Sequence, residues 1–574
     1  MGKRAVQFIL ILALAGTAAW LFKNKGSFSG PPAKLVVTQR TEPDTFNRLA
    51  SSKIPVELIS RLTAAPLVRL NRVSGQIEPA LATSWSASED GLTFTLKLRE
   101  GVVFSDGTPL TAADVVFSFR ALYDPKVASP VASGMMINDK PMTARALDDH
   151  TVAVTFPAPY GPGLSILDAL PILPRHKLED ALNKGIFPST WGLTTPVAEL
   201  TGLGPFVVAE YQPGQRMRFT RNPHYWGKDA NGQPLPRLDE LVMEFTPDQN
   251  AEMLRLQAGT ADLVSEQIRA EDYAALERAA AEHKVQLADA GVDVDPTGLW
   301  FNLRPDSARA KARPWLQREE LRHAISAVID RQQIVNTVFL GAAEPVYGPI
   351  TRGYGPWFVP DVPHTPHDLA QATAWLEAIG LKDRNHDGQL EDAQGRPARI
   401  AVLTRKGNTV LERTLASVQE QLGKIGLGID IVAMERDPML KQFFAGDYDA
   451  MFYGAPVLSL DPANNSDLWL SSGAFHFWNP GQTTPATAWE SQIDTLMREQ
   501  ATTMDLAKRV TLFAQVQKIF AEHEPMIFFA APKVTVAMSA RVTGAVPVVL
   551  KPQILWKPET LGVGGGRHER DKPH

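Results

Sequence analysis

The stretch of sequence that decides the fold is ALATSWSASEDGLTFTLKLREGVVFSDGTPLTAADVVFSF, residues 80–119. Within it Phe94, Leu96 and Leu98 alternate with polar residues, and this period of two is typical of a half-buried strand. Two Asp-Gly dipeptides predict turns. The stretch therefore predicts strands separated by turns and followed by a helix, which is an α+β arrangement.

The start of that helix is marked by a capping pattern. Thr111 takes the N-cap position, and Asp114 stands at the third helical position, where its carboxylate can accept hydrogen bonds from the cap. We interpret the pair as a capping box in which aspartate replaces the usual glutamate.

The same stretch resembles the signature of bacterial solute-binding proteins of family 5, the dipeptide- and oligopeptide-binding receptors of ATP-driven importers. Other motifs are similar to this family and follow in its order, so that the resemblance covers nearly all of the chain beyond the first thirty residues. They are EPDTFN at 42–47, GLGPF at 202–206, RNPHYWG at 221–227, WFN at 300–302, DYD at 447–449 and Asp461-Pro462. The resemblance implies a mixed α/β, two-lobed periplasmic-binding-protein fold with an extra inserted subdomain.

The resemblance also implies domains that are discontinuous in sequence and joined by two hinge strands, near residues 292 and 537. The expected parts are lobe I (34–65, 200–292 and 537–561), the inserted subdomain (66–199) and lobe II (293–536).

Two regions can be interpreted from their own residue patterns. Residues 34–39 predict the first strand of the folded body. Between 410 and 427, apolar residues recur at three- and four-residue spacing, which predicts a helix, and 429–432 predict a strand after it. We therefore expect a β–α–β unit there.

Length and composition exclude several classes of protein. A chain of 574 residues is too long for one core, and 44% hydrophobic residues can fill several. The net charge is −5, from 63 acidic and 58 basic residues, which argues against nucleic acid as a partner. The chain has no cysteine, so disulfides, thiolate metal sites and a lipid-modified cysteine are excluded.

The two ends of the chain differ from its body. Residues 5–22 carry no charge and follow Lys3 and Arg4, which predicts within 1–30 either a cleaved signal peptide or an uncleaved membrane anchor. An ordinary buried helix is the third alternative. Either of the first two places the body in the periplasm or another extracytoplasmic space. At the other end, 562–574 predict a disordered tail.

No constellation of residues predicts an enzyme. The chain has no Gly-x-Ser-x-Gly elbow and no Walker-type loop, and His523-Glu524 lacks the second histidine of a zinc helix. We expect no catalysis and no required cofactor.

One loop has the spacing of a calcium site. Asp383, Asn385 and Asp387 stand at alternate positions before a glycine, as oxygen ligands do in such loops. Gln394 occupies the twelfth position, where a bidentate glutamate is usual. Structural calcium is one interpretation, and a polar turn without metal is the other.

The resemblance supplies the candidate ligand residues. Peptide-binding members place an ammonium-pairing aspartate in a segment that corresponds to GAPVLSLDP at 454–462. Here Ala455 takes the tryptophan position and Leu458 takes the position of that aspartate, so a free-amine clamp is not expected, because leucine offers no partner to a buried ammonium. If the register is shifted, Asp461 is the nearest acid.

The other candidates have alternatives of their own. Asn302 could bond a peptide group, and Trp300 could form either an apolar wall or part of the core. Arg405, with Lys406, could meet an anionic ligand end or form a solvated surface pair. The full candidate set is Glu42, Trp300, Asn302, Arg405, Tyr453, Gly454, Ala455, Leu458 and Asp461.

From the resemblance we expect a monomeric receptor that closes on a peptide or peptide-like solute and delivers it to an inner-membrane ABC permease. A membrane-anchored sensor or scaffold that keeps the receptor fold without transport is the competing hypothesis.

Overall fold

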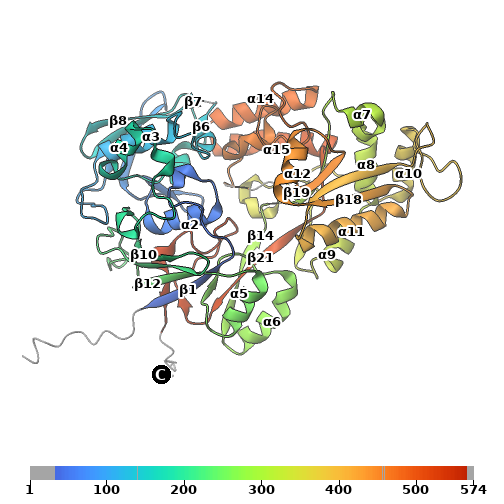
Figure 1. Cartoon of the computed structure of the whole chain (residues 1–574). Helices are drawn as coiled ribbons and strands as arrows, with labels where there is room; N and C mark the ends of the chain where they lie inside the picture. The colour runs from blue at the N-terminus through green and yellow to red at the C-terminus, as the bar shows by residue number, and fades with distance from the viewer. Residues whose placement is uncertain (1–32, 139, 296, 455–456, 458, 565–574) are drawn as a thin grey trace, which may run out of the picture.

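The computed structural model describes residues 33–138, 140–295, 297–454, 457 and 459–564. Two large β-sheets lie in separate halves of the molecule, each covered by helices, and a smaller sheet lies above the first one (Figure 1). The mixed α/β, two-lobed architecture that the sequence predicts is confirmed.

Lobe I is built on an eight-stranded sheet whose strands come from distant parts of the chain. Its central strand β1 pairs in parallel with β12 and β13, and four of its six residues are buried. Burial on both faces is typical of a parallel strand. The strand order is β10 (Phe206–Gln212), β11 (Arg216–Arg221), β12 (Glu240–Phe245), β1 (Lys34–Gln39), β13 (Leu263–Val264), β21 (Ala530–Ser539) and β14 (Val285–Val292), with β16 (Ala343–Pro345) paired to β21. Its helices are α2 (Ile54–Thr63), α5 (Gln249–Gln257) and α6 (Ala270–Ala281).

The inserted subdomain carries an antiparallel sheet of four strands. In order they are β4 (Ala82–Ala87), β5 (Thr93–Leu98), β9 (Thr151–Thr155) and β8 (Thr143–Asp148). In β5 the alternating residues Phe94, Leu96 and Leu98 are buried, as the sequence predicts. Helices α3 (Ala112–Tyr123) and α4 (Arg175–Asn183) pack beside the sheet, and two hairpins join it, β2 (Val68–Leu70) with β3 (Ile77–Pro79) and β6 (Met136–Ile137) with β7 (Lys140–Pro141).

The predicted capping box begins α3. The carboxylate of Asp114 accepts hydrogen bonds from the Thr111 backbone N–H at 2.9 Å and from the Thr111 hydroxyl at 3.1 Å. Its other oxygen accepts from the Arg175 backbone N–H at 3.0 Å, at the start of α4. One buried carboxylate therefore fixes the first turns of two helices.

Lobe II is built on a five-stranded sheet, in the order β18 (Gly428–Met434), β17 (Arg399–Arg405), β19 (Ala450–Gly454), β15 (Thr297–Phe301) and β20 (Met526–Phe528). Strands β17 and β18 are parallel and joined by α11 (Thr409–Gly423), so the predicted β–α–β unit is confirmed. The other helices are α7 (Ala308–Ala312), α8 (Glu319–Val328), α9 (Arg331–Thr337), α10 (Leu369–Ala378), α12 (Arg436–Phe444), α13 (Ser466–Trp469), α14 (Ala488–Thr502) and α15 (Leu506–His523).

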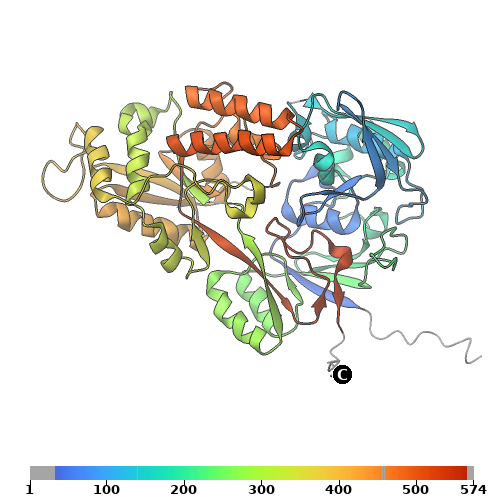
Figure 2. The same cartoon turned by 180° about the vertical axis from the view of Figure 1, so that it is seen from behind.

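The chain passes between the two sheets as a pair of strands. The first crossing runs from β14 to β15, and the second runs from β20 to β21 through Phe529 (Figure 2). The second crossing comes earlier than residue 537, and residues 533–536, which we expected in lobe II, belong to the sheet of lobe I. The reason is the ladder between β21 and β14, which starts at Lys533 and Val292.

The end of the described chain corrects one expectation. Residues 562–574 were expected to be disordered, but β23 (Gly562–Val563) pairs with β22 (Val542–Thr543), and the Gly564 N–H donates to the Arg541 carbonyl at 2.7 Å. Backbone pairing needs no apolar side chains, so composition alone missed it. The predicted signal peptide or anchor, 1–30, lies outside the described residues. Within the described part of the chain, no helix has both the length and the apolar character needed to cross a membrane.

We expect Asp114→Ala to lower the free energy of unfolding by about 1–3 kcal/mol, because three buried hydrogen bonds lose their acceptor. Denaturant or thermal unfolding of the full chain measures the change. Asp149→Ala removes an exposed carboxylate close to the start of the same helix and serves as the control. Equal stability of the two variants would contradict the role given to Asp114.

Candidate functional site

A pocket with about 430 Å³ of empty space opens where the two crossings meet lobe II. One side of it comes from the crossings, through Asp293, Asp295, Thr297, Phe529, Ala530 and Pro532. The other side comes from β19 and the first turns of α11, through Phe452, Val410, Leu411 and Thr414, together with Phe339. The carboxyl ends of the parallel strands β17 and β19 lie at this edge of the sheet, the usual place for a ligand in such sheets.

Asp295 is one of two aspartates that line this pocket, the other being Asp293. One carboxylate oxygen accepts the Val457 N–H at 2.8 Å, and the other lies 3.3 Å from the Lys551 ammonium. Burial raises the pKa of Asp295. Burial alone would lower the pKa of Lys551, but the carboxylates of Asp295, Asp293 and Glu266 outweigh it and raise that pKa.

Sequence reasoning missed Asp295 and Lys551. The signal for Asp295 was present, because the first hinge strand was expected near 292 and an acidic residue follows it closely. Lys551 gave no comparable signal, since it reaches Asp295 across 256 residues of sequence.

The predicted cleft segment borders Asp295. Tyr453 is half-buried and Gly454 ends β19, opposite Thr297 on β15. A Cβ at Gly454 would lie 3.1 Å from the Thr297 hydroxyl, so glycine permits this close approach. Ala455 and Leu458 lie outside the described residues, and their part in ligand binding stays a prediction.

Trp300 belongs to the core of lobe II. Its side chain is 1% exposed, its indole N–H donates to the Tyr453 carbonyl at 2.7 Å, and its ring packs against Phe477 and Trp478. Of the two interpretations of Trp300, an apolar wall and a core residue, the structure agrees with the core residue. Its hydrogen bond supports the backbone at the end of β19.

Asn302 is also buried, and it holds backbone rather than a ligand. Its amide donates to the carbonyls of Gly446 at 3.0 Å and Tyr448 at 2.9 Å. The segment 447–449, whose DYD motif resembles the family, leads into the amino end of β19, the opposite edge of the sheet from Gly454.

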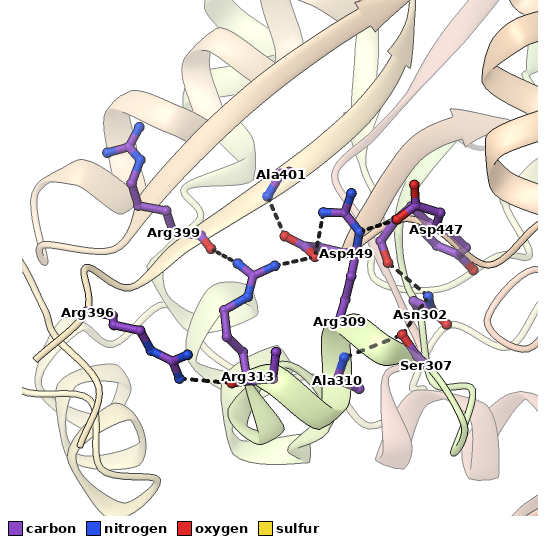
Figure 3. A network of polar contacts seen from close by, with 12 residues as sticks. Asn302, Ser307, Arg309, Ala310, Arg313, Arg396, Arg399, Ala401, Asp447 and Asp449 are labelled. Carbon is purple, nitrogen blue, oxygen red and sulfur yellow. Dashed lines mark hydrogen bonds and ion pairs between the residues drawn. The ribbon is translucent and has the colours of Figure 1, made fainter. Parts of the chain in front are cut away.

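Figure 3 shows what the acidic residues of that segment do. The buried carboxylate of Asp449 lies 2.6 Å from the Arg313 guanidinium and 3.4 Å from that of Arg309, and it accepts the Ala401 N–H at 3.0 Å. Asp447 lies 2.8 Å from Arg309. These contacts fix α7 against strands β17 and β19, which is a structural role.

Glu42 and Arg405 lie apart from the pocket lining. The Glu42 carboxylate accepts from the Tyr211 hydroxyl and the Gly214 N–H, both at 3.0 Å, and so braces the turn between β10 and β11. Arg405 is exposed at the carboxyl end of β17, and the neighbouring Lys406 lies 3.8 Å from Glu435. Arg405 is therefore a solvated surface residue.

Asp461 is held by an arginine. The Arg509 guanidinium, which is almost fully buried, donates to it at 2.8 Å and also bonds the Gln500 carbonyl at 3.0 Å. Both carboxylate oxygens of Asp461 contact this guanidinium, so Arg509 already neutralises the charge of Asp461. Asp461 is the acid that the segment 454–462 shares with the family.

Beside this pair, the subdomain touches lobe II, and we call the contact the clasp: Tyr160 and Gly161 against Asn464, Ala501, Thr503 and Arg509. The Tyr160 hydroxyl donates to the Asn464 side chain, and the Gly161 N–H donates to the Ala501 carbonyl at 2.6 Å. Figure 1 shows α14 and α15 reaching the subdomain here, away from the two crossings.

The candidate calcium loop folds as a compact turn. Asp383, Asp387 and Glu391 each offer an oxygen, and these oxygens lie within 4.8 Å of one another. Asn385 accepts the Asp387 N–H at 2.9 Å. Glu391 was not among the sequence candidates, although the ninth position of such loops often supplies a ligand. Glu391 also accepts the Arg384 N–H at 2.8 Å, so a turn without metal is equally well satisfied.

Comparison with known proteins identifies the family. The model for the middle region of the bacterial extracellular solute-binding proteins, family 5, matches residues 76–477. The chain belongs to this family. This solute-binding protein therefore shares with the family the two lobes described above, and its family places it outside the cytoplasm.

Its relatives have different reported ligands. The oligopeptide-binding protein AppA of Bacillus subtilis is 27% identical over 95% of this chain and 96% of its own length. The structure of AppA with a nonapeptide has a TM-score of 0.71 at 25% identity and covers 93% of this chain and 100% of that one. Heme-binding protein A of Haemophilus influenzae is 28% identical over 84% of this chain and 83% of its own length.

Calcium at Asp383, Asn385 and Asp387 stays a prediction, and thermal melting tests it. We expect calcium to raise the melting temperature relative to chelator, because a ligand that binds only the folded state stabilises it. Asp387→Ala should abolish the difference, whereas Asp361→Ala, which removes an exposed aspartate elsewhere in lobe II, should keep it. An identical melt of the wild type in calcium and in chelator would exclude the site.

Proposed function

We propose that this chain captures a peptide or peptide-like solute between its lobes and delivers it to an inner-membrane ABC permease. The observation that carries this proposal is the clasp. It joins the two halves at a distance from the crossings, so a solute in between would be enclosed from both ends. The relatives that are named for peptides support the choice of solute.

The remaining parts of the proposal concern location and partners. The protein acts outside the cytoplasm as a monomer, without catalysis and without nucleic acid, and its relatives are binding proteins. Residues 5–22 either are removed with a signal peptide or anchor it to the inner membrane. An anchored sensor that keeps the fold without transport is the competing function, and loss of peptide import in a deletion strain that retains its permease would argue against it.

Closure through the clasp can be tested at Gly161. A Cβ there would lie 2.4 Å from the Thr503 carbonyl oxygen and 2.5 Å from the Arg509 Nε, so Gly161→Ala should oppose closure. We expect solute affinity to fall about tenfold, equivalent to about 1.4 kcal/mol, while the melting temperature without solute is unchanged. Isothermal titration calorimetry measures the affinity of the solute that co-purifies with the native protein and is identified by mass spectrometry.

Gly134→Ala is the matched control, because a Cβ at Gly134 meets no atom within 4 Å. Wild-type affinity in Gly161→Ala would show that the lobes do not close through this contact.

The charges near the pocket and beside the clasp generate a second test. Asp461 is matched by Arg509 and Asp295 by Lys551, and Leu458 stands where the family pairs an ammonium. We therefore expect N-acetylation of a peptide to leave its affinity within a few-fold of the free-amine form. Leu458→Asp should favour the free amine, because a buried acid gains most when a cation arrives. Tenfold tighter binding of the free amine by the wild type would mean that one of the existing acids pairs with it.

A further inference from the structure

Three arginines gather around one glutamate where α2 meets the inserted subdomain. The Glu57 carboxylate lies 3.0 Å from the Arg61 guanidinium and 3.9 Å from that of Arg72. Arg48 begins the short helix Arg48–Ala50, which follows β1 in the chain, and its positive charge also attracts the Glu57 carboxylate. Burial would raise the pKa of Glu57, but Arg61, Arg48 and Arg72 outweigh it and lower that pKa. We call Arg48, Glu57, Arg61, Arg72 and Asp168 the arginine cluster.

The arginine cluster holds more positive than negative charge. Its second acid, Asp168, lies 3.6 Å from Arg61, which is therefore well matched. Glu57 already accepts the Arg61 Nε at 3.1 Å, and it is the only carboxylate within ion-pair distance of Arg72 in the described part of the chain. Three guanidinium groups share two carboxylates, so one positive charge is left without a partner.

Neither Arg48 nor Arg72 finds its missing partner elsewhere. Arg48 donates to the Ser51 carbonyl at 2.7 Å, and among the described residues no carboxylate lies within 4.0 Å of it. Arg72 donates to the carbonyls of Leu550 at 3.2 Å and Lys551 at 2.7 Å. Burial and the neighbouring Arg61 lower the pKa of Arg72 to about 9. Carbonyl dipoles orient these cations but do not neutralise them.

The nearby Arg69 shows how an arginine is matched in the same region. Its guanidinium forms an ion pair with the buried carboxylate of Glu559. Burial alone would lower the pKa of Arg69, but the charge of Glu559 outweighs burial and raises that pKa. The contrast matters because isolated charge in an enclosed place is costly. A structural arginine here has a carboxylate of its own, whereas Arg48 and Arg72 share one that Arg61 already uses.

The arginine cluster is connected to the lining of the pocket. Arg72 holds the carbonyl of Lys551, and the ammonium of Lys551 lies 3.3 Å from Asp295. Lys551 therefore links the arginine cluster to Asp295 through two protein contacts. The cluster is only partly exposed to solvent: the side chains of Glu57, Arg61 and Arg72 are 24%, 17% and 5% exposed.

We propose that the arginine cluster binds an anionic end group of the solute, a carboxylate or a phosphate, at Arg48 and Arg72. This inference rests on the proposed function. It further specifies that the solute carries a negative charge at one end and that this end binds in lobe I. Guanidinium groups suit this task because they remain charged when buried and match the geometry of both anions.

The test compares three tripeptide libraries bound to the full chain: free C-terminal acids, C-terminal amides, and amides whose last residue is phosphoserine. Competitive native mass spectrometry measures which members bind, and calorimetry of the tightest ones gives affinities. We expect at least one anionic library to bind tenfold or more tighter than the plain amides. The acid arm and the phosphoserine arm distinguish the two anions.

Variants assign the preference to the cluster. Arg48→Gln and Arg72→Gln should each lower the anion-to-amide affinity ratio about tenfold, and Glu57→Gln should raise it by removing a competing carboxylate. Arg175→Gln removes an exposed arginine that pairs with Glu179, and it should leave the ratio unchanged. A purely structural arginine would change the affinities of all libraries equally, and the ratio would stay constant.

Each result decides between the two proposals. Equal binding of all three libraries overturns the anion inference and leaves the proposed function standing. Binding of no library by the wild type overturns the proposed function and the inference with it. An anion preference that survives both Arg48→Gln and Arg72→Gln places the anion elsewhere and overturns the inference alone.

Discussion

The molecule depends on one antiparallel ribbon that runs through both lobes. Residues 285–292 pair with 533–539 in lobe I, and 298–300 pair with 526–528 in lobe II. The same two segments therefore contribute neighbouring strands to both large sheets. Between the two ladders lie Asp293, Asp295 and Phe529, whose backbone belongs to neither sheet. Because only two short links connect the sheets within the ribbon, the lobes can change their angle there while each core stays intact.

Charged groups in the molecule are arranged in two different ways. Asp461 and Arg509 form a matched pair within lobe II, beside the clasp, and removing one partner of such a pair typically costs about 3–5 kcal/mol because it leaves a buried charge. The arginine cluster has one more positive charge than negative charges, and it is partly exposed to solvent. The Asp461–Arg509 pair stabilises lobe II next to the clasp. The excess positive charge of the arginine cluster can instead attract an anion from solution.

Sequence predicts what depends on neighbours in the chain. The alternation in β5, the Thr111–Asp114 box and the β17–α11–β18 unit all follow from residues less than forty positions apart, and all three are found. Side chains whose partners lie far away behave differently. Trp300 stands on the expected strand and Asn302 directly follows it, yet both form hydrogen bonds to residues more than 140 positions away. The family motif gave their positions but not their partners.

The ribbon also sets the order in which the chain can fold. β21 lies between β13 and β14 in the sheet of lobe I, so this sheet stays open until residues 530–539 have been made. Contacts between segments so far apart form slowly, because a long loop must close first. A chain that acts outside the cytoplasm has to cross a membrane. Because β21 is synthesised near the end of the chain, the sheet of lobe I cannot be completed until almost the whole chain has been made. This delay favours crossing of the membrane in an extended state.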